Sequence, residues 1–108
     1  MPIDRKLRQE VKSRPCLICG QKPGDPDNPV DPCHVRTYGA TRQDHPKNLI
    51  PMCRRHHNQQ HGNGPRAGWA YLLKEHPRLK RDLEAMGWVI YPHPFQPNKM
   101  CMFHPEVK

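Results

Sequence analysis

The chain has 108 residues, of which 34% are hydrophobic and 6% aromatic, and it carries 14 prolines. This length allows one small domain, and so small a share of hydrophobic residues requires an additional stabilising element such as a bound metal. No apolar stretch approaches the length that spans a bilayer, and the first residues lack the apolar segment of a secretory signal, so we expect no membrane association and a reducing, cytoplasmic compartment. The net charge of +8 favours an anionic partner such as nucleic acid.

Residues 1–15 are predicted to form a basic arm. Ile3, Leu7 and Val11 recur at the spacing of one helix face, which predicts a helix over residues 3–12 that ends before Pro15. Positive charges in this arm suit contact with the phosphate backbone of a nucleic acid. They belong to Arg5, Lys6, Arg8, Lys12 and Arg14.

Residues 16–64 are predicted to form the core of the domain. The segment 16–20 has the form of a zinc knuckle, and the segment 21–32 is rich in proline, which predicts an irregular loop. The elements expected after the knuckle are two short strands and a helix, over residues 31–38, 48–52 and 54–61.

Residues 65–108 are predicted to form a helical appendage that belongs to the same single domain. Apolar residues at helical spacing predict two helices, which Pro77 separates and Gly87 ends. A short strand over residues 88–91 is expected next, followed by a proline-rich tail over residues 92–108.

Four residues have the spacing of a closed zinc site. Cys16 and Cys19 form a C-x2-C pair, and Cys53 and His56 form a C-x2-H pair at the start of the predicted helix. Thiolate and imidazole groups in this pattern bring four ligands into a tetrahedron around a structural Zn²⁺. The competing interpretation, reduced cysteines without a metal, leaves the second pair unexplained. The fifth cysteine, Cys101, is expected to be a spare.

A second group of residues remains after the zinc ligands are assigned. His57 and His61 lie four apart, so they share one face of the predicted helix and can hold a second metal. A strand–loop–strand–helix arrangement would fold His34 on the first strand and Asn48 on the second toward them. We expect His34 to act as a general base, and Asn48 to brace the hairpin and the His34 ring by hydrogen bonds.

Positive side chains surround these predicted ligands, which suits a phosphodiester substrate. A single histidine or asparagine is more often structural than functional, so the interpretation depends on the joint order of His34, Asn48 and His57. The residues expected to contact nucleic acid are Arg36, Arg42, Lys47, Arg54 and Arg55.

The stretch from Cys16 to His61 resembles the HNH endonuclease family, whose members are built on the ββα-metal fold. The blocks DPCHVRTYGA and NLIPMCRRHHNQQH, and the segment GWVIY after a Trp-containing helix, look especially like small phage and prophage members. The resemblance implies an α+β domain with a ββα-metal core, a zinc knuckle and C-terminal helices. It also implies hydrolysis of DNA in the cytoplasm of a bacterium or a phage-infected host, with His34 activating water. His57 and His61 would then bind one catalytic Mg²⁺, Mn²⁺, Ni²⁺ or Zn²⁺.

One position departs from the family pattern. The residue before the general base is usually Asp or His and binds the catalytic metal, whereas this chain has Cys33. A thiolate is a soft ligand that favours Zn²⁺ over Mg²⁺. We expect Cys33 to face the catalytic metal; the alternatives are that Asp31 or a water takes this place, or that activity is weakened.

Other functions fit some of the same residues. A zinc-stabilised DNA-binding module without catalysis would use the basic arm and the zinc site, but it would not need His34 beside two metal-binding histidines. A nuclease specialised for branched or recombining DNA would use all of them, and no residue separates it from an enzyme that cuts duplex DNA in general. An oxidoreductase that uses the C-x2-C pair is disfavoured because no βαβ pattern surrounds that pair.

Overall fold

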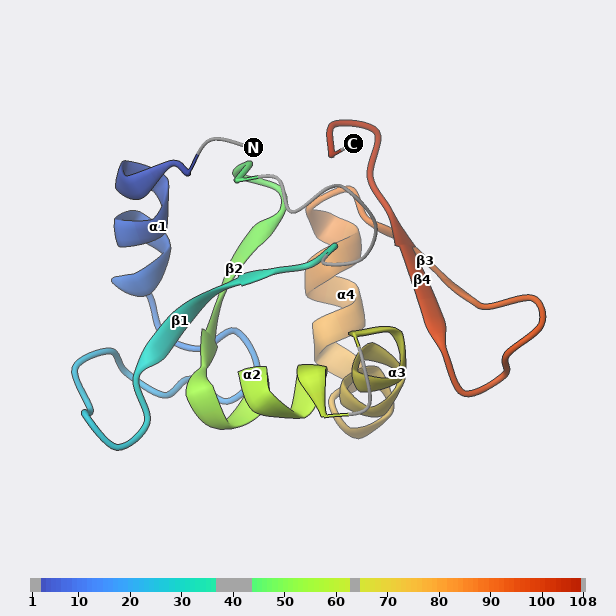
Figure 1. The fold of residues 1–108 in the computed structure, drawn as a ribbon, viewed down its shortest axis with the longest axis horizontal. Helices are drawn as coiled ribbons and strands as arrows, with labels where there is room; N and C mark the ends of the chain where they lie inside the picture. Colours follow the sequence, from blue (N-terminus) through green and yellow to red (C-terminus); the bar gives the residue numbers. More distant parts are fainter. Residues whose placement is uncertain (1–2, 37–43, 63–64, 108) are drawn as a thin grey trace.

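The computed structural model describes residues 3–36, 44–62 and 65–107. Four helices and two antiparallel two-stranded sheets make up this part of the chain, so the α+β class expected from the sequence is confirmed. None of these helices is both long and apolar enough to cross a membrane. Their order is α1 (Arg5–Lys12), β1 (Val30–His34), β2 (Leu49–Cys53), α2 (Arg54–His61), α3 (Pro65–Glu75), α4 (Pro77–Ala85), β3 (Val89–Pro92) and β4 (Met100–Phe103), as drawn in Figure 1.

The first sheet pairs β1 with β2 and sets two prolines opposite each other, Pro32 and Pro51. Proline lacks the N–H of a ladder hydrogen bond, so an antiparallel pair accepts it where the backbone groups point away from the partner strand. The carbonyl of Pro51 points outward in this way and accepts a hydrogen bond from the N–H of Leu17 at 2.8 Å. This bond fastens the knuckle at residues 16–20 to the sheet.

Strand β1 ends at His34, earlier than the stretch 31–38 expected from the sequence, of which residues 37 and 38 lie outside the described part of the chain. Two residues later, the N–H of Arg36 donates to the side-chain Oδ1 of Asn48 at 2.8 Å. Asn48 is completely buried. Its amide therefore holds the chain where the strand pair ends.

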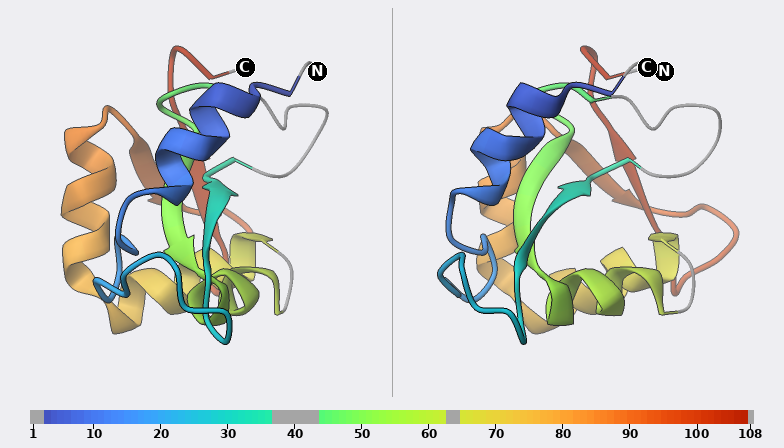
Figure 2. Two further views of the ribbon diagram at one scale, coloured as in Figure 1. Left: turned by 90° about the vertical axis from the view of Figure 1, so that its left-hand side faces the viewer. Right: turned by 60° about the vertical axis from the view of Figure 1, so that its left-hand side comes forward.

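Helix α1 begins at Arg5 because Asp4 caps it. A carboxylate oxygen of Asp4 accepts a hydrogen bond from the N–H of Leu7 at 3.0 Å, which is the geometry of an N-cap. Ile3 therefore lies outside the helix and remains 62% exposed, whereas Val11 is buried. The helix packs along β1 and β2, as the views in Figures 1 and 2 show.

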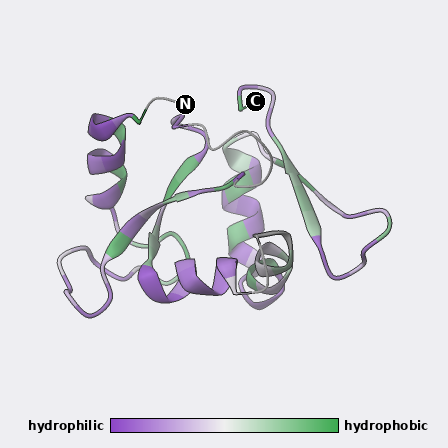
Figure 3. Ribbon diagram, viewed as in Figure 1, coloured by the Kyte–Doolittle hydropathy of each residue, from purple (hydrophilic) through white to green (hydrophobic). Residues whose placement is uncertain are grey.

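Helix α2 follows β2 without a connecting loop, has the bounds expected from the sequence, and contains no hydrophobic residue. Figure 3 shows it as hydrophilic along its length. Its buried side chains are polar, namely His56 and Gln60. Burial of its own apolar side chains cannot hold such a helix in place, so its attachment depends on polar contacts, including those of these two side chains.

Helix α3 approaches the end of α2 at Gly68. A Cβ atom at this position would overlap the backbone carbonyl of Gln60, so the two helices come this close only because glycine is there. Trp69, the next residue, is fully buried and donates its indole N–H to the carbonyl of Val35 at 2.9 Å. The C-terminal helices are thereby bonded to the chain that leaves β1.

The C-terminal third shares one hydrophobic core with the strands, and this core includes Cys16, Trp69, Met102 and Val107. The tail expected over residues 92–108 contains a strand that the sequence analysis did not predict. This strand is β4, which pairs with β3 as an antiparallel hairpin. The hairpin lies at the opposite side of the molecule from α1 (Figure 1).

Candidate functional site

The first group of polar residues is the set predicted to bind zinc: Cys16, Cys19, Cys53 and His56. Their ligand atoms all lie within 4.8 Å of one another. Nδ1 of His56 is 3.2 Å from Sγ of Cys53 and 3.9 Å from Sγ of Cys16, and the sulfurs of Cys19 and Cys53 are 3.8 Å apart. Ligands of a tetrahedral Zn²⁺ are about 3.3–3.8 Å apart. These four side chains, the zinc cluster, can therefore hold a metal ion such as zinc.

Local backbone geometry brings the zinc cluster together. The turn after Cys16 is closed by the N–H of Gly20, which donates to the Cys16 carbonyl at 2.9 Å, and Gly20 has a φ of 75° that glycine adopts without strain. Cys53 ends β2 and occupies the N-cap position of α2, so its spacing to His56 spans the first helical turn. The hydrogen bond between the knuckle and β2 then joins the two halves of the cluster.

Two members of the zinc cluster are biased toward the forms that bind metal. Burial would raise the pKa of the Cys53 thiol, but hydrogen bonds from the His56 backbone and from Asn28 outweigh it and lower this pKa. Burial, and to a smaller extent the charges of His76 and Arg55, lowers the pKa of His56. Thiolate and neutral imidazole are the forms that ligate a metal. With four protein ligands the cluster is closed, which is typical of a structural zinc.

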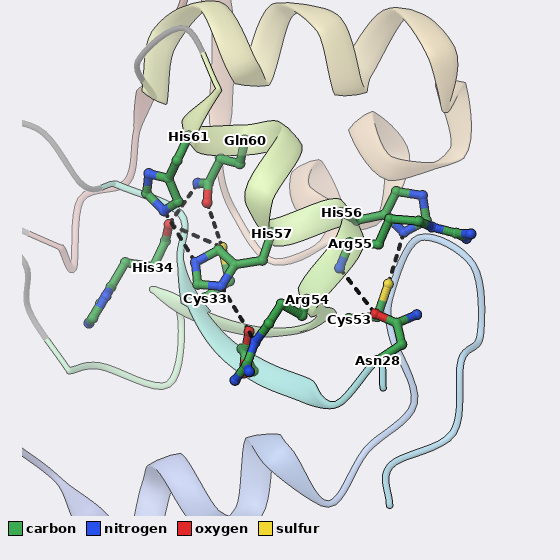
Figure 4. A network of polar contacts seen from close by, with 11 residues as sticks. Asn28, Cys33, His34, Cys53, Arg54, Arg55, His56, His57, Gln60 and His61 are labelled. Atoms are coloured by element: carbon green, nitrogen blue, oxygen red, sulfur yellow. Dashed lines mark hydrogen bonds and ion pairs between the residues drawn. The ribbon is translucent and has the colours of Figure 1, made fainter. Parts of the chain in front are cut away.

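The second group contains the two remaining histidines of α2 and Asp31 of β1. Nε2 of His61 lies 3.2 Å from Nε2 of His57, and Nδ1 of His57 lies 3.2 Å from a carboxylate oxygen of Asp31. The two rings lie next to each other in Figure 4. An ionised carboxylate only accepts hydrogen bonds, so Nδ1 of His57 is the donor and its Nε2 carries the lone pair. Two ring nitrogens at this separation fit neighbouring ligands of one divalent ion, which are about 3 Å apart.

Asp31 also accepts hydrogen bonds from Arg54. Nε and Nη2 of Arg54 donate to the two carboxylate oxygens at 3.3 and 3.0 Å. Burial would raise the pKa of Asp31, but the hydrogen bonds from Arg54 and His57 outweigh it and lower this pKa below its ordinary value. The carboxylate therefore stays ionised and continues to orient the ring of His57.

Cys33 makes its contact elsewhere. Its side chain is completely buried, and Sγ lies 2.9 Å from Oε1 of Gln60. Burial raises the pKa of the Cys33 thiol far above its ordinary value, so the group stays protonated and donates to Gln60. A protonated thiol is a poor metal ligand. This contact does not support the ligand role expected for Cys33, and Asp31 is the residue of β1 that contacts His57.

His34 lies near α2 through its backbone but not through its ring. Its carbonyl oxygen accepts a hydrogen bond from Nε2 of Gln60 at 3.1 Å. The ring extends away from His57 and His61 in Figure 4, and its Nε2 lies 2.8 Å from Oδ1 of Asp44. Asp44 rather than Asn48 therefore holds the ring, because the side-chain oxygen of Asn48 accepts from the backbone of the hairpin.

The five residues predicted to contact nucleic acid lie in different settings. Arg54 and Arg55 are exposed at the start of α2, and Arg54 is engaged with the carboxylate described above. Arg36 and Lys47 are partly buried. Arg42 lies outside the described residues. Of the four predicted residues that the structure describes, the two exposed ones therefore lie at the start of α2.

The sequence did not indicate Gln60 or Asp44 as residues of this region, and it indicated Asp31 only as an alternative to Cys33. Asp31 had an available signal, because it lies two residues before Cys33 and shares one strand face with it. Gln60 precedes His61, and nothing in its spacing indicates that it binds β1. No sequence pattern could have indicated the role of Asp44, because its partners Arg8 and His34 are 36 and 10 residues away along the chain.

Comparisons with known proteins leave the function to be argued from the residues themselves. No family model matches the chain, and neither a curated protein nor a solved structure matches it significantly. The zinc cluster and the His57–His61 pair are therefore the observations on which a functional assignment rests.

Proposed function

We propose that this chain is a metal-dependent endonuclease of the HNH type that hydrolyses phosphodiester bonds in DNA. In this proposal His34 is the general base, His57 and His61 hold one catalytic divalent metal, and the zinc cluster stabilises the fold. The observation that carries it is the approach of the two Nε2 atoms of His57 and His61 to 3.2 Å on α2, which directly follows β2. The succession of strand, strand and helix is the one that the family resemblance implies.

The His57–His61 pair has the chemistry of a metal site with open positions. Two imidazole nitrogens occupy only part of the coordination sphere of Mg²⁺, Mn²⁺, Ni²⁺ or Zn²⁺, in contrast to the four ligands of the zinc cluster. A divalent ion held there would supply positive charge that stabilises the oxygen leaving phosphorus. Asp31 orients His57 for this role through its hydrogen bond to Nδ1.

Residues of the protein itself would activate the water. His34 would accept the proton of a water molecule that attacks phosphorus, as the bond from phosphorus to the leaving oxygen breaks. Gln60 fixes the carbonyl of His34, and Asn48 fixes the backbone of Arg36 two residues later. These two contacts fix the backbone at the end of β1. A general base needs such a fixed position, because its nitrogen must stay within reach of the attacking water.

The distribution of charge supports DNA as the substrate. The net charge is +8, and Arg55 exposes a positive side chain next to the zinc ligand His56. Lysine and arginine side chains bind phosphates with release of counterions, so binding should weaken steeply as salt increases. A binding affinity that does not respond to salt would contradict this part of the proposal.

A second function, a zinc-stabilised DNA-binding module without catalysis, is favoured by one observation. The ring of His34 is engaged by Asp44 and extends away from His57 and His61 (Figure 4). If the ring of His34 keeps this orientation, away from His57 and His61, when DNA is bound, the chain binds DNA without cutting it. A nuclease specialised for branched or recombining DNA, of the kind that phage recombination requires, uses the same residues and differs only in its substrate.

Nicking of supercoiled plasmid separates these functions. Purified protein is incubated with plasmid in Mg²⁺, Mn²⁺, Ni²⁺ or Zn²⁺, together with the variants His34→Ala and His57→Ala. His93→Ala is the matched control, because His93 lies in the β3–β4 connection, where its backbone N–H bonds to the carbonyl of Lys99. We expect the wild type and the control to nick in at least one metal, and the other two variants to bind plasmid without nicking it.

Each other outcome selects a different function. Nicking that survives in His34→Ala would refute the general-base role. Plasmid that shifts on a gel without nicking in any metal would favour the DNA-binding module. Faster cutting of a four-way junction than of a linear duplex would identify the specialised nuclease.

A further inference from the structure

Asp44 is an almost completely buried carboxylate that joins α1 to His34. Its side chain is 2% exposed. Oδ1 accepts from Nη2 of Arg8 at 2.9 Å and lies 2.8 Å from Nε2 of His34. Oδ2 accepts from Nε of Arg8 at 2.7 Å and from the backbone N–H of Asp4 at 2.8 Å. Each carboxylate oxygen is therefore used twice, and three different residues meet at one side chain.

This arrangement selects one tautomer of the His34 ring. An ionised carboxylate has no proton to donate, so Nε2 of His34 carries the proton between the two groups. In a neutral imidazole this leaves the lone pair on Nδ1. Among the described residues, Nδ1 of His34 has no hydrogen-bond partner, and the side chain is 16% exposed. Nδ1 of His34 is not among the buried polar atoms that lack a partner, so water can reach this nitrogen.

We propose that Asp44 is a positioning residue that fixes His34 in the tautomer with Nδ1 as its basic nitrogen. When Nδ1 takes a proton from water, Asp44 also stabilises the imidazolium that forms. A carboxylate behind a basic histidine has this double effect wherever the pair is preorganised. The catalytic part of this inference rests on the proposed function, whereas the tautomer is a property of the protein alone.

Arg8 keeps Asp44 in the ionised state that this role requires. Its hydrogen bonds, more than that of His34, lower the pKa of the Asp44 carboxyl far below its ordinary value. Helix α1 presents Arg8, so an element outside the β1–β2–α2 unit supports the ring of His34. Arg8 therefore acts inside the protein, in addition to any contact that the basic arm makes with DNA.

A purely structural role is the competing explanation, because the same carboxylate fastens α1 to the chain before β2. Two variants separate the roles. Asp44→Asn preserves the shape of the side chain, but an amide can either accept from or donate to Nε2 of His34, so it no longer dictates the tautomer. Asp4→Ala removes the N-cap of α1 and weakens that helix, while the side chains of Asp44 and His34 stay opposite each other.

Long-range ¹H–¹⁵N correlation spectra of the histidine rings test the tautomer without DNA. The zinc-loaded full chain is used, and the signals that disappear in His34→Ala assign the ring. We expect the wild type and Asp4→Ala to carry the proton on Nε2, and Asp44→Asn to show both tautomers. A wild-type ring protonated on Nδ1, or an unchanged ratio of tautomers in Asp44→Asn, would overturn the inference. The wild-type spectrum decides alone if Asp44→Asn does not fold.

Kinetics on plasmid then test the catalytic consequence. Asp44→Asn should lower kcat about tenfold or more and leave KM unchanged. A positioned general base contributes about 10²- to 10⁴-fold in rate, and the loss in Asp44→Asn should be a part of that contribution. Asp4→Ala should keep kcat at temperatures well below its melting transition. Equal losses in the two variants would leave Asp44 with a structural role and overturn the inference. The expected tautomer without nicking in any metal would instead refute the nuclease proposal and leave the tautomer assignment in place.

Discussion

The thiol of Cys33 on β1 donates a hydrogen bond of 2.9 Å to Oε1 of Gln60 on α2, and neither side chain is exposed. Gln60 uses the other end of its amide as well, since Nε2 donates to the carbonyl of His34 at 3.1 Å. This one amide therefore joins a helix without hydrophobic residues to β1 at two points, in addition to the contacts of Arg54 and His57 with Asp31. His56 of the zinc cluster provides a further attachment of the helix.

Cys33→Ser is expected to keep the metal preference of nicking and to cost about 1 kcal/mol of unfolding free energy, because a hydroxyl still donates to Gln60. Cys33→Asp places a carboxylate at the same buried position and should cost about 3 kcal/mol or more, as unpaired buried charges do. Urea unfolding of the zinc-loaded variants measures both values. A changed metal preference in Cys33→Ser would instead make the thiol a metal ligand.

Removal of zinc is expected to unfold the domain. Cys16→Ser should lose the cooperative thermal transition and the helical circular dichroism signal, because folding and metal binding are coupled where the core is small. Cys101→Ser is the matched control, since Cys101 lies on β4 and outside the zinc cluster. A Cys16→Ser protein that melts at the wild-type temperature would show that the cluster is not structural.

Gly68→Ala is expected to be destabilising although alanine is the better helix former. The added Cβ would overlap the carbonyl of Gln60, and the separation of α2 and α3 that follows should cost about 1–3 kcal/mol. Chemical unfolding of the zinc-loaded protein measures this loss. Gly62→Ala provides the comparison, because a Cβ there meets its nearest neighbouring atom at 3.6 Å.

The Arg8–Asp44 pair should make stability depend on acidity. Arg8 lowers the pKa of Asp44 in the folded protein, whereas the pKa of an aspartate in an unfolded chain is about 3.9. The ionised carboxylate therefore adds stability that is complete above this value and is lost as the pH falls below it. We expect the difference in unfolding free energy between wild type and Asp44→Asn to be constant above about pH 5 and to shrink below about pH 4. A difference that widens on acidification would contradict the pairing.

Arg55→Ala is expected to weaken DNA binding and to reduce the slope of log affinity against log salt by about 1, as the loss of one phosphate contact does. The fold should be unaffected because the side chain is exposed. Arg81→Ala, an exposed arginine on α4, is the charge-matched control. An equal change in slope in both variants would indicate a general effect of net charge and not a contact at the start of α2.

Local spacing in the sequence was sufficient to predict the zinc cluster and the bounds of α2. The two halves of the cluster are a C-x2-C turn and a C-x2-H helical turn, and each is formed by neighbouring residues. His57 and His61 were predictable as a pair for the same reason, since a helix places residues four apart on one face. These predictions depend on the geometry of single elements and not on how the elements pack.

The sequence alone determined which side chains have the chemistry to bind metal or accept a proton, while the tertiary structure decided which of them meet. Cys33 has the right position along the chain for a metal ligand, yet burial keeps its thiol protonated and its Sγ donates to Gln60. Asp44 has no motif around it, yet the tertiary structure places it between Arg8 of α1 and His34 of β1. Contacts between distant residues depend on the packing of several elements at once, and one-dimensional spacing does not contain that information.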